Sequence, residues 1–146
     1  MKRAKRLEPV REIAREAERS CAARVSGMER RLAEAEHRYQ ELLRYQQEYQ
    51  QSFRDRAGAG LDVRSLREYQ TFLARLAGAI ESQRAVLQQL RDDCDRERGQ
   101  LREAIARRLA LSKVIEKANI EERVMDDRRM QRELDERAQR PRLVQP

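Results

Sequence analysis

The chain has 146 residues, of which 40% are charged and 39% are hydrophobic, with only five glycines and three prolines. This composition excludes an ordinary globular domain with a large apolar core. It leaves either a disordered chain or extended helices whose apolar residues recur with a helical period. The net charge of +7 suggests nucleic acid or an acidic membrane as partner, but basic and acidic residues intersperse along the chain, in i,i+4 pairs such as Glu34–Arg38.

The first predicted element is a helix over about residues 8–55, with Pro9 in its first turn. The basic cluster before it, Lys2 to Arg6, is expected to be a frayed and solvated terminus. Apolar residues then recur at helical spacing and predict a seam that faces a second helix. The seam positions are Val10, Ile13, Ala17, Cys21, Val25, Met28, Leu32, Ala35, Tyr39, Leu42, Gln46, Tyr49 and Phe53.

A turn is expected over about residues 56–65, because Gly58 and Gly60 mark the one plausible break between the termini. Ser65 lies three residues before Glu68, which is the spacing of a helix N-cap with its capping-box acid. The second helix is therefore predicted to begin next to Ser65, at about residue 66.

The second helix is predicted over about residues 66–140, followed by a short tail over 141–146 that begins with Pro141. Its apolar residues alternate by four and three in a strict heptad pattern, which predicts a left-handed coiled coil. The heptad positions are Leu66, Tyr69, Leu73, Leu76, Ile80, Gln83, Leu87, Leu90, Cys94, Glu97, Leu101, Ala104, Arg108, Leu111, Ile115, Ala118, Glu122 and Met125.

A short turn forces two such helices to pack antiparallel, so the predicted fold is an all-α hairpin, a single coiled-coil domain over residues 1–146. Facing residues should then have numbers that sum to about 121. Residue 8 would face about residue 113, so the second helix is expected to overhang alone from about 114 to 140. Cys21 and Cys94 would lie too far apart along the axis for a disulfide.

We expect no enzyme, no metal and no cofactor. The chain has one histidine, His37, no tryptophan, no phosphate-binding loop and no cysteine pair at metal spacing. No apolar stretch approaches the roughly 20 residues that span a bilayer. The basic start is not followed by the apolar h-region of a signal peptide, so a cytosolic or peripheral protein is expected.

All six aromatic residues lie between positions 39 and 72, near the predicted turn. Four of them lie on or next to the seam, whereas Tyr45 and Phe72 lie off the heptad positions, as does the nearby Ala79. The rule that facing residue numbers sum to about 121 pairs four residues along one edge of the second helix with four residues of the first helix. We call these eight residues the tip strip. It consists of Phe72, Leu76, Ala79 and Gln83 facing Tyr49, Tyr45, Leu42 and Arg38. We favour a partner-binding surface over simple edge packing, because Tyr, Phe and Arg are typical interface anchors.

The sequence resembles the flagellar export protein FliJ family over nearly its whole length. The resemblance is carried by the run from Leu42 to Tyr49, the Gly58–Gly60 turn, the segments Tyr69–Leu73 and Ala79–Gln83, and more weakly by Leu134–Arg140. It implies a stalk-like antiparallel coiled coil in the flagellar type III protein export apparatus, at the cytoplasmic side of the inner membrane.

The implied partners are the ring of the export ATPase FliI, the linker of the export gate protein FlhA, and export chaperones. No nucleic acid is implied, and membrane contact would come only through the apparatus. The gate contact would correspond to Phe72, Leu76 and Ala79, with Gln83 where the family has histidine and Arg38 where glutamine is usual.

We expect the overhang and the start of the first helix to enter the ATPase. The residues of this expected contact are Val10, Ile13, Ile115, Ala118, Arg123, Met125, Arg128 and Arg129. Three alternatives stay open: the stalk of a virulence-type secretion system, a structural coiled coil that self-associates through the tip strip, and a nucleic-acid-binding hairpin that rests on the net charge alone.

Overall fold

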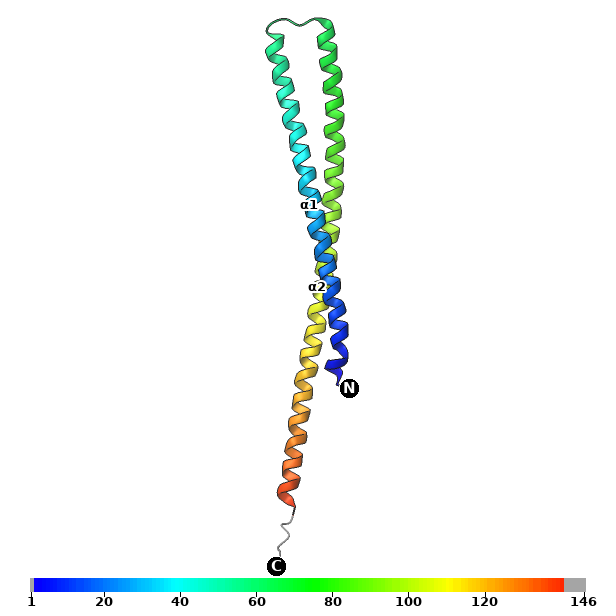
Figure 1. The fold of residues 1–146 in the computed structure, drawn as a ribbon, viewed down its shortest axis with the longest axis vertical. Helices are drawn as coiled ribbons and strands as arrows, with labels where there is room; N and C mark the ends of the chain where they lie inside the picture. The colour runs from blue at the N-terminus through cyan, green and yellow to red at the C-terminus, as the bar shows by residue number, and fades with distance from the viewer. Residues whose placement is uncertain (1, 141–146) are drawn as a thin grey trace, which may run out of the picture. The chain divides into compact units, whose positions relative to one another are not determined.

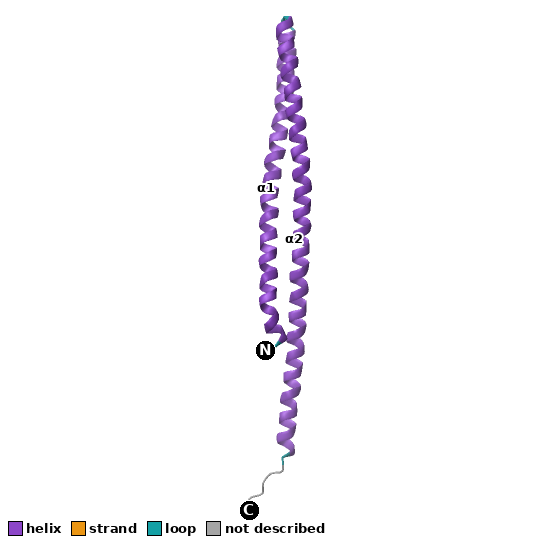
Figure 2. Ribbon diagram, turned by 90° about the vertical axis from the view of Figure 1, so that its right-hand side faces the viewer, coloured by secondary structure: helices purple, strands orange, loops and turns teal. Residues whose placement is uncertain are grey.

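The structure is a computed structural model that describes residues 2–140. It contains two helices, α1 over Arg3–Ala57 and α2 over Val63–Gln139, which pack antiparallel and are joined by a short turn (Figure 1). Every element within the described residues is helical (Figure 2). The predicted all-α hairpin is confirmed, whereas the predicted tail over 141–146 lies outside the described residues.

Contacts divide the chain into two compact units. The turn unit comprises residues 20–101 and contains the turn between the helices. The terminal unit comprises residues 2–19 together with residues 102–140, that is, the first part of α1 and the last part of α2. None of the helical residues described forms a stretch that is long and apolar enough to cross a membrane.

The turn is built by Gly60 and Asp62. Gly60 has a φ of +92°, a left-handed conformation that glycine adopts without steric cost. The Asp62 carboxylate accepts a 2.9 Å hydrogen bond from the Ser65 backbone N–H, so Asp62 caps α2. The predicted cap at Ser65 is therefore wrong, and α2 begins at Val63, earlier than predicted, because Asp62 satisfies the free N–H of its first turn.

The predicted heptad of α2 is confirmed from Tyr69 to Glu122, where every seam position is buried or half-buried. Only the two outermost positions fail, since Leu66 is 40% exposed and Met125 is 62% exposed. Both cysteines of the turn unit lie buried in the seam as free thiols, Cys94 completely. Burial on one side of the helix is what the alternation by four and three requires.

The seam of α1 follows the prediction from Cys21 to Phe53 and departs from it before Cys21. Val10 and Ile13 are 44% and 70% exposed, and Ala17 is exposed as well. The strict alternation instead continues toward the N-terminus through positions that are all buried or half-buried. These are Glu18, Ala14, Arg11, Leu7 and Ala4.

The basic N-terminus is helical and packed rather than frayed. Ala4 is buried in a small core with Ile115 and Ala118, and Leu7 packs against this core. The Ala4 backbone N–H donates to the Glu122 carboxylate at 3.3 Å, although the pairing rule places about residue 117 there. The predicted start of α1 at about residue 8 is thus wrong, and Pro9 lies inside the helix.

This packing also shortens the overhang of α2. The Lys2 ammonium forms a 3.0 Å ion pair with Asp126, so α1 reaches that position. The segment of α2 without an α1 neighbour begins after about residue 126 instead of residue 114, and all its described residues are exposed. The segment continues an already formed helix, but it buries no apolar side chain against α1.

Candidate functional site

Five of the six aromatic residues form one continuous cluster across the two helices in the turn unit. Phe53 and Tyr69 stack with ring centroids 3.5 Å apart, and Tyr49 packs against both Tyr69, at 5.4 Å, and Phe72, at 4.2 Å. Tyr45 meets the edge of Phe72 at 5.8 Å, with an interplanar angle of 81°. The offset Tyr49–Tyr69 pair and the edge-on Tyr45–Phe72 pair stabilise the packing beyond the apolar area that they bury.

Some residues of the tip strip are buried or half-buried between α1 and α2. Leu76 is buried, with 6% of its surface exposed, and the Gln83 side-chain amide donates a 3.1 Å hydrogen bond to the Ala35 carbonyl. Leu76 therefore belongs to the seam and not to the exposed part of the strip, whereas Gln83 is half-buried; the gate contact of both residues stays a prediction. Tyr49, Leu42 and Phe72 are half-buried.

Three residues of the tip strip are exposed: Tyr45, Ala79 and Arg38. Tyr45 is 49% exposed although its ring touches Phe72 and Tyr49. An aromatic side chain held by two other aromatic rings and half open to solvent presents a rigid apolar surface at little entropic cost. This part of the strip can receive a partner without unfolding the seam.

A groove beside Phe72 was missed by sequence reasoning. It is lined by Tyr49, Phe72 and one side of the first turns of α2, where Arg64, Arg67 and Arg75 lie. The spacing of Arg64, Arg67, Thr71 and Arg75 by three, four and four could have revealed this basic side. Glu68 also lines the groove and pairs with Arg64 at 3.4 Å, so Arg67 and Arg75 supply its excess of positive charge beside the aromatic rings.

The residues expected to contact the ATPase separate into two groups. Ile115 and Ala118 are 1% and 4% exposed beneath Ala4, so they are core residues and are not available to a partner. The other six residues of the expected ATPase contact are exposed. Two further apolar side chains of the terminal unit are exposed too, Met130 at 61% and Leu134 at 56%. The exposed members of the predicted set are Val10, Ile13, Arg123, Met125, Arg128 and Arg129.

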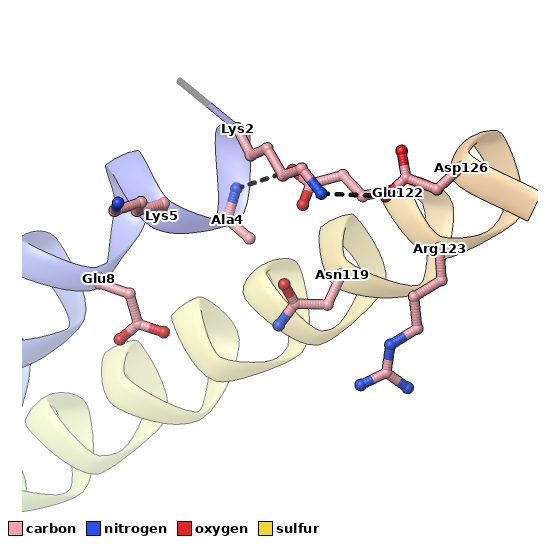
Figure 3. A pocket seen from close by; sticks show the side chains of 8 residues that line it. All are labelled: Lys2, Ala4, Lys5, Glu8, Asn119, Glu122, Arg123 and Asp126. Atoms are coloured by element: carbon pink, nitrogen blue, oxygen red, sulfur yellow. Dashed lines mark hydrogen bonds and ion pairs between the residues drawn. The ribbon is translucent and has the colours of Figure 1, made fainter. Parts of the chain in front are cut away.

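The polar depression near the N-terminus has no excess of one charge (Figure 3). Lys2 is paired with Asp126, and Glu122 holds the Ala4 backbone N–H. Lys5 and Arg123 lie on its rim together with Glu8. Both signs of charge alternate around the depression, which lies between the N-terminal end of α1 and residues 119–126 of α2, so it has no preference for an anion.

The described residues offer no arrangement suited to catalysis. Nowhere in residues 2–140 do three or more His, Cys, Asp or Glu side chains gather as metal ligands would. His37 pairs at 2.9 Å with Glu41 one helical turn away, and both side chains are more than half exposed. The fold defines a class, the antiparallel helical coiled coil of two long helices.

Comparison with known proteins identifies the family. The family model described as "Flagellar FliJ protein" matches residues 2–143, which is nearly the whole chain. The chain belongs to the flagellar FliJ protein family, whose members are non-catalytic structural components of flagellar export. No curated protein and no solved structure matches the chain.

Proposed function

We propose that this chain is the stalk-like component of the flagellar type III export apparatus that couples the export ATPase FliI to the export gate protein FlhA. Membership of the family implies a component of the export apparatus. What we propose beyond this membership is the identity of the two partners and the coupling between them. The chain would work at the cytoplasmic side of the inner membrane and would also bind export chaperones.

The observation that carries the proposal is the presence of two different exposed surfaces in the two units. In the turn unit, Tyr45 is half-exposed with its ring against Phe72, and Ala79 is exposed as well. In the terminal unit, Met130 and Leu134 are exposed on the part of α2 that α1 does not cover. A protein that only spaces two objects would need neither surface, because exposed aromatic and aliphatic anchors mark binding sites.

We assign the gate contact to the exposed part of the tip strip and its half-buried support. Phe72 and Tyr49 hold Tyr45 in place, and Arg38 and Ala79 extend the surface along the two helices. Leu76 and Gln83 contribute by fixing the seam beneath it. A variant of Leu76 would therefore confuse lost binding with lost packing.

We assign the ATPase contact to α2 beyond about residue 126, with Val10 and Ile13 as a second exposed patch. This segment combines the apolar side chains Met130 and Leu134 with the exposed Arg128 and Arg129. A single uncovered helix is slim enough to enter a ring, and its arginines can pair with carboxylates on the inner wall.

The gate contact is tested by co-purification with the cytoplasmic domain of FlhA. We expect Tyr45→Ser and Ala79→Asp to lower the affinity by about tenfold or more, because each changes an exposed residue of the strip that is not itself a seam position. Gln47→Ser, an exposed change on α1 outside the strip, is the matched control. Unchanged gate binding by both strip variants would refute the assignment.

The ATPase contact is tested by shortening the chain after residue 126. The shortened protein keeps the Lys2–Asp126 pair and the Ala4 core, so it should fold and still bind the gate domain. We expect it to lose both binding to FliI and stimulation of its ATPase activity. If both survive the deletion, the terminal segment is not the contact.

A further inference from the structure

The side of α2 that faces away from α1 carries a second heptad pattern, between residues 106 and 138. Along it, ten exposed positions recur by alternating steps of four and three. Three of its members are large and open to solvent: Ile120 is 53% exposed, Val124 43% and Leu134 56%. An exposed apolar stripe in a strict heptad is typical of a helix that pairs with another helix. The apolar members are Ala106, Ala110, Ile120, Val124, Leu134 and Ala138.

The four polar members of this back face restrict how a partner helix can lie. They are Lys113 and Lys117 before its centre, and Asp127 and Gln131 after it. A second copy in parallel would place Lys113 against Lys113 and Lys117 against Lys117 in successive layers, and Asp127 against Asp127 three layers further on. Like charges in the seam disfavour that arrangement.

An antiparallel second copy satisfies the same four residues. With the two-fold axis at residue 122, Lys117 meets Asp127 of the second copy and Lys113 meets Gln131 of the second copy. Each of these layers occurs twice because the interface is isologous. Opposite charge and hydrogen-bonding groups then face each other along the whole polar part of the stripe.

The same register also matches the apolar layers. Ile120 meets Val124 of the second copy in the two central layers, and Ala110 meets Leu134 of the second copy further out. Shifting one copy by a heptad in either direction places Lys117 against Ile120 or against Leu134. One register of the antiparallel pair therefore joins apolar to apolar and charge to opposite charge, which is how coiled coils select a partner.

We propose that a second copy of this chain is the partner of the back face, in a symmetric antiparallel dimer through residues 106–138 of α2. Because four of the ten layers are polar, the dimer is weak, with a Kd of about 10 to 100 µM. It covers Leu134 of the segment assigned to the ATPase, so ring binding and self-pairing exclude each other. That consequence rests on the proposed function, whereas the dimer itself does not.

The test is sedimentation equilibrium of the full chain from about 5 to 500 µM with charge-exchange variants. We expect Lys117→Asp and Asp127→Lys each to weaken the dimer about tenfold or more, because each brings two pairs of like charges together. The double exchange should return the Kd to within about threefold of the original. Residues 117 and 127 lie about 15 Å apart on one helix, so this rescue can occur only between copies.

The matched control is Arg129→Asp, which makes the same change of charge on the seam side of α2 and should leave the dimer unchanged. Helix content by circular dichroism should stay constant throughout, since every changed residue is exposed. A chain that stays monomeric to about 500 µM, or a double exchange without rescue, overturns the proposal. Intact ATPase and gate binding by such a chain would reject the dimer alone and leave the proposed function standing.

Discussion

Individual glycines play opposite roles in the turn and in the helices. A Cβ added at Gly60 or at Gly78 would meet no atom within 4 Å, so space does not distinguish the two positions. The backbone does, because Gly60 has a φ of +92° whereas Gly78 lies inside α2. Left-handed backbone is costly for any residue with a Cβ, and glycine weakens a helix.

We therefore predict that Gly60→Ala lowers the free energy of unfolding by about 1 to 2 kcal/mol. Gly78→Ala should raise it by about 0.5 to 1 kcal/mol. Thermal unfolding followed by circular dichroism measures both changes, and each variant serves as the size control for the other. Shifts of the melting temperature in the same direction would contradict this account of the turn.

The cap of α2 predicts a pH dependence at one residue. The Ser65 hydroxyl and then the Ser65 backbone N–H donate to the Asp62 carboxylate and lower the pKa of Asp62. Because the folded pKa lies below the unfolded one, the stabilisation is complete above the unfolded value of about 3.9. It disappears as the pH falls through the lower folded value.

The melting temperature of Asp62→Ala should accordingly lie below that of the unchanged chain at about pH 7, and the difference should shrink at about pH 2. Asp62→Asn keeps an acceptor at the N-cap without a titrating carboxyl group. Its difference from Asp62→Ala should therefore not change with pH. A pH-independent difference between the unchanged chain and Asp62→Ala would show that the carboxylate is not the cap.

Helix α1 illustrates how a polar layer can be placed inside a seam. Glu18 forms an ion pair with Arg108 of α2, and their side chains are only 24% and 29% exposed. Both residues occupy seam positions in the terminal unit. Removing one partner leaves a partly buried charge without compensation, whereas replacing both with apolar residues usually preserves or increases stability.

We predict that Glu18→Ala lowers the free energy of unfolding by about 1 kcal/mol or more. Glu18→Leu combined with Arg108→Leu should restore it to at least the original value, because Leu packs well in heptad positions. Urea denaturation measures both variants. A double variant less stable than Glu18→Ala would mean that these positions do not face each other in the seam.

The two helices differ in how much of their structure could be predicted from sequence. The seam of α2 was predictable because Leu, Ile and Ala repeat there with little interruption from Tyr69 to Ala118. The start of α1 was not, since its seam holds Arg11 and Glu18 while Val10 and Ile13 point to solvent. Glu18 can occupy the seam because of Arg108, a partner on the other helix that a single-helix pattern does not reveal.

The candidate sites were predictable where they depend on residue type and unpredictable where they depend on packing. Tyr45 and Phe72 lie off the heptad, and this was enough to single them out. Leu76 was assigned both to the seam and to the tip strip, and the seam placement is the observed one. Burial of Ile115 depends on Ala4, whose segment has the composition of a frayed terminus.

At the scale of the whole molecule, the proposed coupling needs one chain to carry both the gate contact and the ATPase contact. The surface proposed for the gate lies in the turn unit and the surface proposed for the ATPase in the terminal unit, and continuous helices run through both. A helix transmits position because its backbone hydrogen bonds resist stretching and bending. Coupling therefore needs Tyr45 and Leu134 in the same polypeptide.

The most direct test is secretion of flagellar export substrates by cells in which variants replace this chain. Tyr45→Ser and the chain shortened after residue 126 should each reduce secretion strongly, with Gln47→Ser as the control that does not. Both defective chains expressed together should still secrete poorly, because neither joins the gate to the ATPase. Restored secretion in that strain would contradict the claim that a single chain couples the two partners.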